Sequence, residues 1–108
     1  MQQKIWISYD LGVRGDYEGL YAWLDDHKAK DCVDNLAFID YDCDGDLVEC
    51  LKKDLGESVE INKKTRIYVV WRDPKAKKTK GRFVFGGRRA APWVGYGTAE
   101  EQVEADES

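Results

Sequence analysis

The segment KIWISYDL, residues 4–11, decides the fold of this chain, because it is the most strand-like run in the sequence. Its apolar residues recur at every second position, which is the period expected of a β-strand. The positions between them include Trp6, Ser8 and Asp10. We therefore expect one face of this strand to pack under helices. Because an exposed Trp is rarely left entirely in water, we expect part of the other face to be covered.

Two helices are predicted by apolar residues at helical spacing. The first follows a glycine-containing turn, has Asp16 as its N-cap and extends to about Lys28. The second begins after Asp46, which together with Glu49 fits a capping box. It ends before Gly56, a residue suited to the position that follows a helix.

Short apolar runs bounded by turn residues predict the other extended segments, which are residues 29–35, 36–41, 66–72, 82–86 and 92–97. The first two form a hairpin with its turn at Asp34-Asn35, or one longer strand as the alternative. The next two are joined by a lysine-rich turn at residues 73–81. The last is either a short edge strand or a packed aromatic clip.

This order of elements predicts a single domain at residues 1–98, followed by a disordered acidic tail at 99–108. A four-stranded antiparallel sheet with two helices on one face accommodates the order with right-handed crossovers. We therefore expect an α+β fold, the ferredoxin-like sandwich βαββαβ with an extra C-terminal strand.

Length and composition exclude several classes of protein. The chain has 108 residues, of which 43% are hydrophobic, and this indicates one folded domain rather than a disordered chain. It has no apolar run of membrane-spanning length and no signal-peptide pattern, so we expect a cytoplasmic protein that does not enter a membrane. Cys32, Cys43 and Cys50 are then expected to be free thiols.

The net charge of −4 is unevenly distributed along the chain. Residues 1–62 contain 6 basic and 15 acidic side chains, whereas residues 63–89 contain 11 basic side chains and only one acidic one. This asymmetry indicates either a basic surface for an anionic partner or neutralisation of one half of the chain by the other.

The basic side chains lie on and around the predicted C-terminal hairpin, at Lys75, Lys77, Lys78, Lys80, Arg82, Arg88 and Arg89. Phe83, Phe85 and Trp93 are nearby. Basic residues interleaved with aromatic ones are typical of RNA or DNA binding, since they neutralise phosphates and stack on bases. The alternative is a solvated hairpin whose lysines keep an edge strand from aggregating.

An acidic motif follows the second strand of the predicted hairpin. Asp40, Asp42 and Asp44, with Gly45 after them, match the first half of a calcium-binding loop. The twelfth position of that loop is Leu51 rather than the required acid. The pattern favours a solvated acidic turn that caps the second helix, with weak Ca²⁺ binding as the alternative.

The strand ending in Tyr9-Asp10, its glycine-containing turn and the Asp16-Tyr17 helix start resemble SinR-type and VapD-like small proteins. These are relatives of the CRISPR-adaptation nuclease subunit, and the similarity covers residues 4–72. The resemblance implies a ferredoxin-like homodimer in which two copies of Asp10 hold Mg²⁺ against a phosphodiester. The acidic first half, the lysine-rich turn and the Gly-Gly-Arg-Arg segment depart from that pattern.

The basic hairpin predicts nucleic-acid binding, and the resemblance implies a homodimer with metal-dependent endonuclease activity at the paired Asp10. In this interpretation the basic hairpin binds phosphate. The alternative is a non-catalytic protein–protein interaction factor, such as a phage- or defence-related binding protein, in which the open sheet face docks a protein partner.

Overall fold

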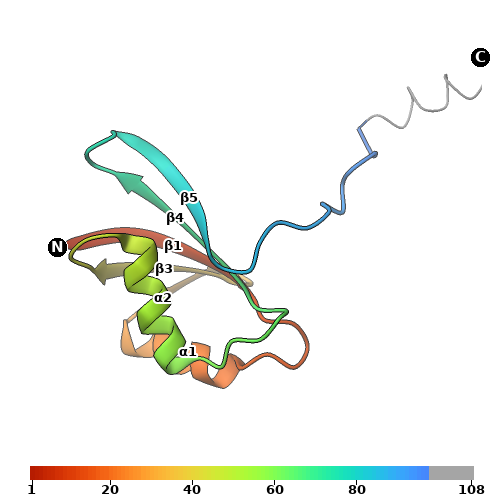
Figure 1. Ribbon diagram of the computed structural model, residues 1–108, viewed down its shortest axis with the longest axis horizontal. Coiled ribbons are helices and arrows are strands. Elements are labelled where there is room, and N and C mark those ends of the chain that lie inside the picture. Colours follow the sequence, from red (N-terminus) through yellow and green to blue (C-terminus); the bar gives the residue numbers. More distant parts are fainter. Residues whose placement is uncertain (98–108) are drawn as a thin grey trace, which may run out of the picture.

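The computed structural model describes residues 1–97 as five strands and two helices. In chain order they are β1 (Gln2–Asp10), α1 (Tyr17–Asp26), β2 (Lys30–Val33), β3 (Leu36–Asp42), α2 (Leu47–Ser58), β4 (Arg66–Asp73) and β5 (Lys78–Phe85). The strands form one sheet in the order β2-β3-β1-β4-β5, and every neighbouring pair is antiparallel (Figure 1). The predicted α+β fold, with an antiparallel sheet and two helices, is confirmed.

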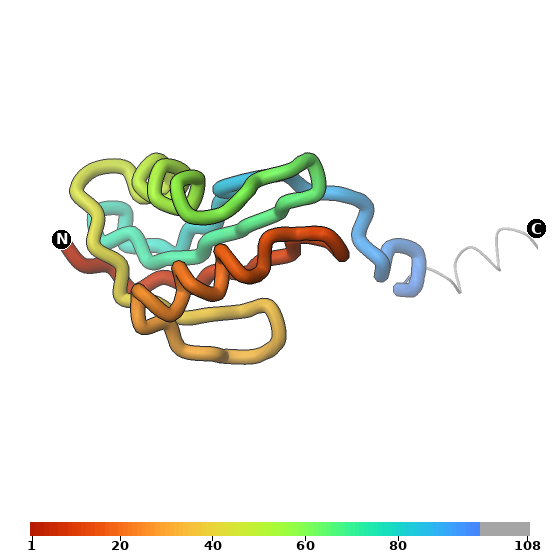
Figure 2. The backbone as a smooth tube through the Cα atoms, turned by 90° about the horizontal axis from the view of Figure 1, so that it is seen from below, coloured from red at the N-terminus to blue at the C-terminus, as the bar shows by residue number. Residues whose placement is uncertain are grey.

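Both helices cover the same face of the sheet (Figures 1 and 2). The strand alternation predicted for β1 explains this arrangement, because Ile5 and Ile7 are fully buried. They belong to the same core cluster as Leu20 of α1 and Leu51 of α2. Burying one such aliphatic side chain stabilises a fold by about 1.5–3 kcal/mol. The opposite face, which we call the open face, carries no helix within residues 1–97.

Aspartates cap both helices, as the sequence predicts. Asp16 accepts hydrogen bonds from the backbone N–H groups of Gly19 and Glu60, both at 2.9 Å, and so joins the start of α1 to the chain after α2. These hydrogen bonds lower the pKa of Asp16. Asp46 accepts a hydrogen bond from the N–H of Val48 at 3.1 Å. Among the hydrogen bonds of residues 1–97 there is none from the Asp46 N–H to Glu49, so the predicted capping box is not formed, and the Glu49 carboxylate lies 3.9 Å from Lys52 Nζ.

Several predicted boundaries are wrong. Helix α2 continues through Gly56 to Ser58, because Val59 extends the buried face that Leu55 belongs to. Strand β5 begins at Lys78 rather than at residue 82, so the lysine-rich turn is shorter than predicted. Residues 92–97 form turns with Trp93 exposed, which is neither an edge strand nor a packed clip. The predicted acidic tail, 99–108, lies outside the described residues.

The cysteines also differ from the prediction. Cys43 and Cys50 form a disulfide, because the turn between β3 and α2 brings their Cα atoms to 6.2 Å, within the usual range for a disulfide. Cys32 alone is a free, exposed thiol among the described residues. The same part of the chain contains no helix long and apolar enough to cross a membrane.

Candidate nucleic-acid interface

Four aromatic side chains form a row across the open face, one from each of four adjacent strands. They are Phe38 of β3, Trp6 of β1, Tyr68 of β4 and Phe83 of β5. Trp6 lies directly opposite Phe38, and their ring centroids are 5.1 Å apart. Tyr68 lies opposite Phe83 at 4.8 Å, edge to face. The aromatic row therefore consists of two ring pairs held by the sheet register.

A glycine in β5 makes room for this arrangement. Gly81 pairs with Val70, two residues along β4 from Tyr68. A Cβ atom at Gly81 would collide with the hydroxyl end of the Tyr68 ring. The ring therefore lies against the β5 backbone, where any larger side chain would displace it. Trp6 remains 40% exposed, so its ring is accessible to solvent on the open face.

Cationic side chains lie beside these rings. Lys4 Nζ is 5.8 Å from the centroid of Phe38, and the guanidinium carbon of Arg66 is 5.8 Å from that of Phe83. The guanidinium carbon of Arg88 is 5.9 Å from the centroids of both Tyr68 and Phe83. These distances are within the range of cation–π attraction. The open face thus combines stacking surfaces with positive charge.

Asp10 lies at one end of this face, at the end of β1. Its Oδ2 atom is 3.2 Å from Arg89 Nη2 and 3.9 Å from Arg66 Nη1, and Arg66 is its cross-strand partner. Its Oδ1 atom accepts a hydrogen bond from the N–H of Gly12 at 3.1 Å. The carboxylate is thus paired with two guanidinium groups from separate parts of the chain.

A pocket of about 290 Å³ opens next to this carboxylate. Its lining residues come from β1, β4, β5 and the segment after β5, and they are Ser8, Tyr9, Asp10, Arg66, Tyr68, Phe83 and Arg88. We call it the Asp10 pocket. Arg66, Arg88 and Arg89 lie in or beside this pocket, and we call them the arginine cluster. The pocket therefore places these arginines next to the Tyr68–Phe83 ring pair.

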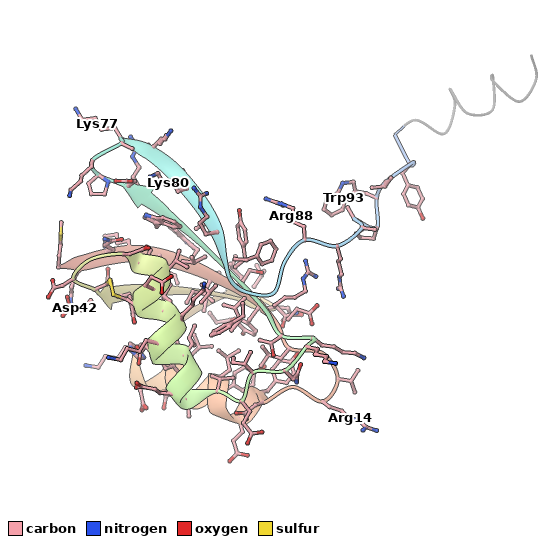
Figure 3. The ribbon with its side chains drawn as sticks, viewed as in Figure 1. Arg14, Asp42, Lys77, Lys80, Arg88 and Trp93 are labelled. Carbon is pink, nitrogen blue, oxygen red and sulfur yellow. A yellow bond between two sulfur atoms is a disulfide. The ribbon has the colours of Figure 1, made fainter. Side chains whose placement is uncertain are left out.

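The basic residues predicted from the sequence do not form one cluster. Figure 3 shows Lys77 and Lys80 near the tip of the β4–β5 hairpin and Arg88 beyond the other end of β5. The eight residues of β5 span about 26 Å in an extended strand. Only Arg88 and Arg89 of the predicted set reach the Asp10 pocket and its carboxylate.

At the hairpin tip, part of the positive charge is neutralised locally. Lys80 Nζ lies 2.7 Å from Asp73 Oδ2. Asp73 also accepts hydrogen bonds from the backbone N–H groups of Lys75 and Ala76. The hydrogen bond from Lys80, followed by those from the two backbone groups, lowers the pKa of Asp73 to about 2. These contacts indicate that Lys80 and Asp73 stabilise the hairpin.

The acidic motif after β3 also has cationic partners. The ammonium group of Met1 lies 2.8 Å from Asp42 and 3.0 Å from Asp44, and Lys4 lies 3.4 Å from Asp40. Within residues 1–97, no three His, Cys, Asp or Glu side chains are grouped so that they would hold a metal ion. Binding of Ca²⁺ here, or of Mg²⁺ at Asp10, stays a prediction.

Sequence reasoning missed two of the four rings, Phe38 and Tyr68, and two of the cations beside them, Lys4 and Arg66. A usable signal was present, because the alternation of strand 66–72 assigns Ile67 and Val69 to the core and so Arg66 and Tyr68 to the open face. Comparisons with protein-family models, with curated proteins and with solved structures find no match for this chain. The resemblance to SinR-type and VapD-like proteins therefore stays a prediction.

Proposed function

We propose that the open face of the sheet binds single-stranded nucleic acid. The observation that carries the proposal is the aromatic row with cations beside its rings. Stacking of one base on an aromatic side chain contributes about 1–3 kcal/mol and tolerates any base, because every base has a π-face. Arginine and lysine beside the rings then neutralise the phosphates that connect the bases.

The row favours a single strand over a duplex. Bases in a duplex stack on one another, so their faces are not available to protein rings, whereas unpaired bases can be splayed out and stacked. Diagonal neighbours on adjacent strands, such as Trp6 and Tyr68, are about 7–8 Å apart. The two ring pairs are therefore positioned to receive bases from a short extended stretch of one strand.

The same proposal includes the ferredoxin-like form of the fold. The order β2-β3-β1-β4, with a helix after β1 and another after β3, supports two interleaved βαβ units to which β5 is added. This arrangement leaves one face of the sheet for a ligand, because both helices pack on the other. The homodimer implied by the resemblance stays a prediction.

The surroundings of Asp10 favour binding over cleavage. A divalent metal at this carboxylate must displace Arg89 and Arg66 or share the site with two positive guanidinium groups. Like charges at such distances repel each other. Metal-dependent cleavage remains testable by incubating a labelled RNA or DNA with the protein and Mg²⁺. If it occurs at paired Asp10 residues, Asp10→Asn will abolish it.

Fluorescence anisotropy with labelled single-stranded and duplex oligonucleotides tests the proposed function. We expect the single strand to bind more tightly, and we expect Tyr68→Ala and Phe83→Ala each to weaken its binding by a factor of about 5 to 150. Tyr21→Ala is the matched control, because Tyr21 is a half-exposed aromatic residue on α1, away from the open face.

Equal effects of the three variants would contradict a role for the aromatic row. If no salt-sensitive binding to either nucleic acid is measured, the proposal is wrong, and the open face is better explained as a docking surface for a protein partner.

A further inference from the structure

We propose that the Asp10 pocket binds one nucleotide of the strand, with its phosphate taken up by Arg66 and Arg89 in place of the Asp10 carboxylate. While no nucleotide is bound, the Asp10 carboxylate takes the place of the phosphate and pairs with the two arginines. This inference rests on the proposed function and deepens it, because it names the group that the pocket recognises.

The charge of the pocket supports an anionic ligand. Arg66, Arg88 and Arg89 bring three guanidinium groups to a site with a single carboxylate, Asp10. The guanidinium fork matches the geometry of carboxylate and phosphate alike. A phosphate therefore fits the position that the Asp10 oxygen now occupies between Arg66 and Arg89.

The ion pairs that Asp10 makes are of a kind that a ligand can replace. One oxygen, Oδ2, is shared between Arg89 at 3.2 Å and Arg66 at 3.9 Å. The Asp10 side chain is 45% exposed, and that of Arg89 is 68% exposed. Exposed ion pairs contribute little to stability, since solvent screens both charges. A phosphate that offers an oxygen to each arginine competes well with one shared carboxylate oxygen.

The size and the walls of the pocket support one nucleotide rather than a larger ligand. A volume of about 290 Å³ is at the lower end of the range for small-molecule pockets. Tyr68 and Phe83 form its aromatic wall, next to the arginine cluster. A base and its phosphate need this combination of a stacking surface and positive charge.

Arg88 is placed to cover the base. Its guanidinium carbon is 5.9 Å from the ring centroids of Tyr68 and Phe83. A base between guanidinium and ring needs two contact distances of about 3.5–4 Å each, or about 7–8 Å in all. Arg88 must therefore move outward by about 1–2 Å, after which the base is stacked on both sides.

The test compares Asp10→Asn with Asp40→Asn. Both variants remove one negative charge from the open face, but Asp40 is on β3 beside Lys4 and outside the Asp10 pocket. Asn keeps an oxygen that accepts the Gly12 hydrogen bond, so the turn after β1 is retained in Asp10→Asn. Binding is measured by anisotropy with a single-stranded octanucleotide and by NMR titration with a nucleoside 5′-monophosphate and the matching nucleoside.

We expect Asp10→Asn to bind the monophosphate about fivefold more tightly than Asp40→Asn does, because it relieves repulsion of the phosphate in the Asp10 pocket. The affinity for the uncharged nucleoside should be the same in both variants. Equal affinities of the two variants for the monophosphate, or weaker binding of the monophosphate by Asp10→Asn, would overturn the inference. Absence of octanucleotide binding by the unmodified protein would instead refute the proposed function on which the inference rests.

Discussion

The salt dependence of binding separates the open face from the hairpin tip as the site of phosphate contacts. For single-stranded nucleic acid, the logarithm of the binding constant falls against the logarithm of salt concentration with a slope of about −0.7 per phosphate neutralised. The number of cationic side chains in a surface therefore fixes the slope. The two candidate surfaces on this protein contain different numbers.

Four cations of the open face lie beside its rings or beside Asp10, and they are Lys4, Arg66, Arg88 and Arg89. If the pairs with Asp40 and Asp10 keep two of them neutralised, the expected slope is about −1.4, and if all four act on phosphates it is about −2.8. Between 50 and 200 mM salt, affinity then falls by a factor of about 7 to 50.

Contacts by the hairpin tip as well would add three cations, Lys75, Lys77 and Lys78. The slope would then approach about −4.9, and affinity would fall about 900-fold over the same salt range. Anisotropy titrations of a labelled octanucleotide at four salt concentrations distinguish these values.

Two variants check the assignment of charges to phosphates. Arg88→Gln removes one open-face cation and should reduce the slope by about 0.7, whereas glutamine in place of the three hairpin-tip lysines should leave it unchanged. A slope steeper than about −4 that the hairpin variant reduces by about 2 would show that the hairpin tip also contacts phosphates, and it would refute their confinement to the open face. A slope near zero would refute any phosphate contact.

Two further predictions follow from local contacts. Gly81→Ala should weaken single-strand binding, because its Cβ displaces the Tyr68 ring, whereas Gly87→Ala, with open space at its Cβ, should have no effect in the same anisotropy assay. The lowered pKa of Asp73 means that its pairing with Lys80 stabilises the fold above about pH 4 and that this contribution is lost as pH falls through about 2. Thermal melts between pH 2 and 5 should therefore fall more steeply for the unmodified protein than for Asp73→Asn.

The local pattern of the sequence predicts most of the fold. Alternation in residues 4–11 correctly separates the buried Ile5 and Ile7 from the exposed Trp6, because strand periodicity is a property of neighbouring residues. The caps at Asp16 and Asp46 are equally local. Boundaries fail where packing extends an element, as in α2, which continues past Gly56 because its buried face continues.

The candidate site depends on register, which a single sequence does not specify. Trp6 meets Phe38 across β1 and β3, and Asp10 meets Arg66 across β1 and β4. Each pair joins residues far apart in the chain, so neither pairing is evident from local pattern. The predicted basic residues lie on and around one hairpin, but an extended β5 separates those at its tip from Arg88 and Arg89.

The structure supports both interpretations of the uneven charge. Part of it is neutralised internally, since Asp10 of the acidic first half pairs with Arg66 and Arg89 of the basic segment. Yet these three residues meet beside the aromatic row, where two arginines share one carboxylate. The Arg88 guanidinium also lies over the Tyr68 and Phe83 rings there. Neutralisation therefore leaves surplus positive charge beside stacking surfaces. Because charge alone does not distinguish this face from the hairpin tip, the rings provide the stronger argument for where a nucleic acid binds.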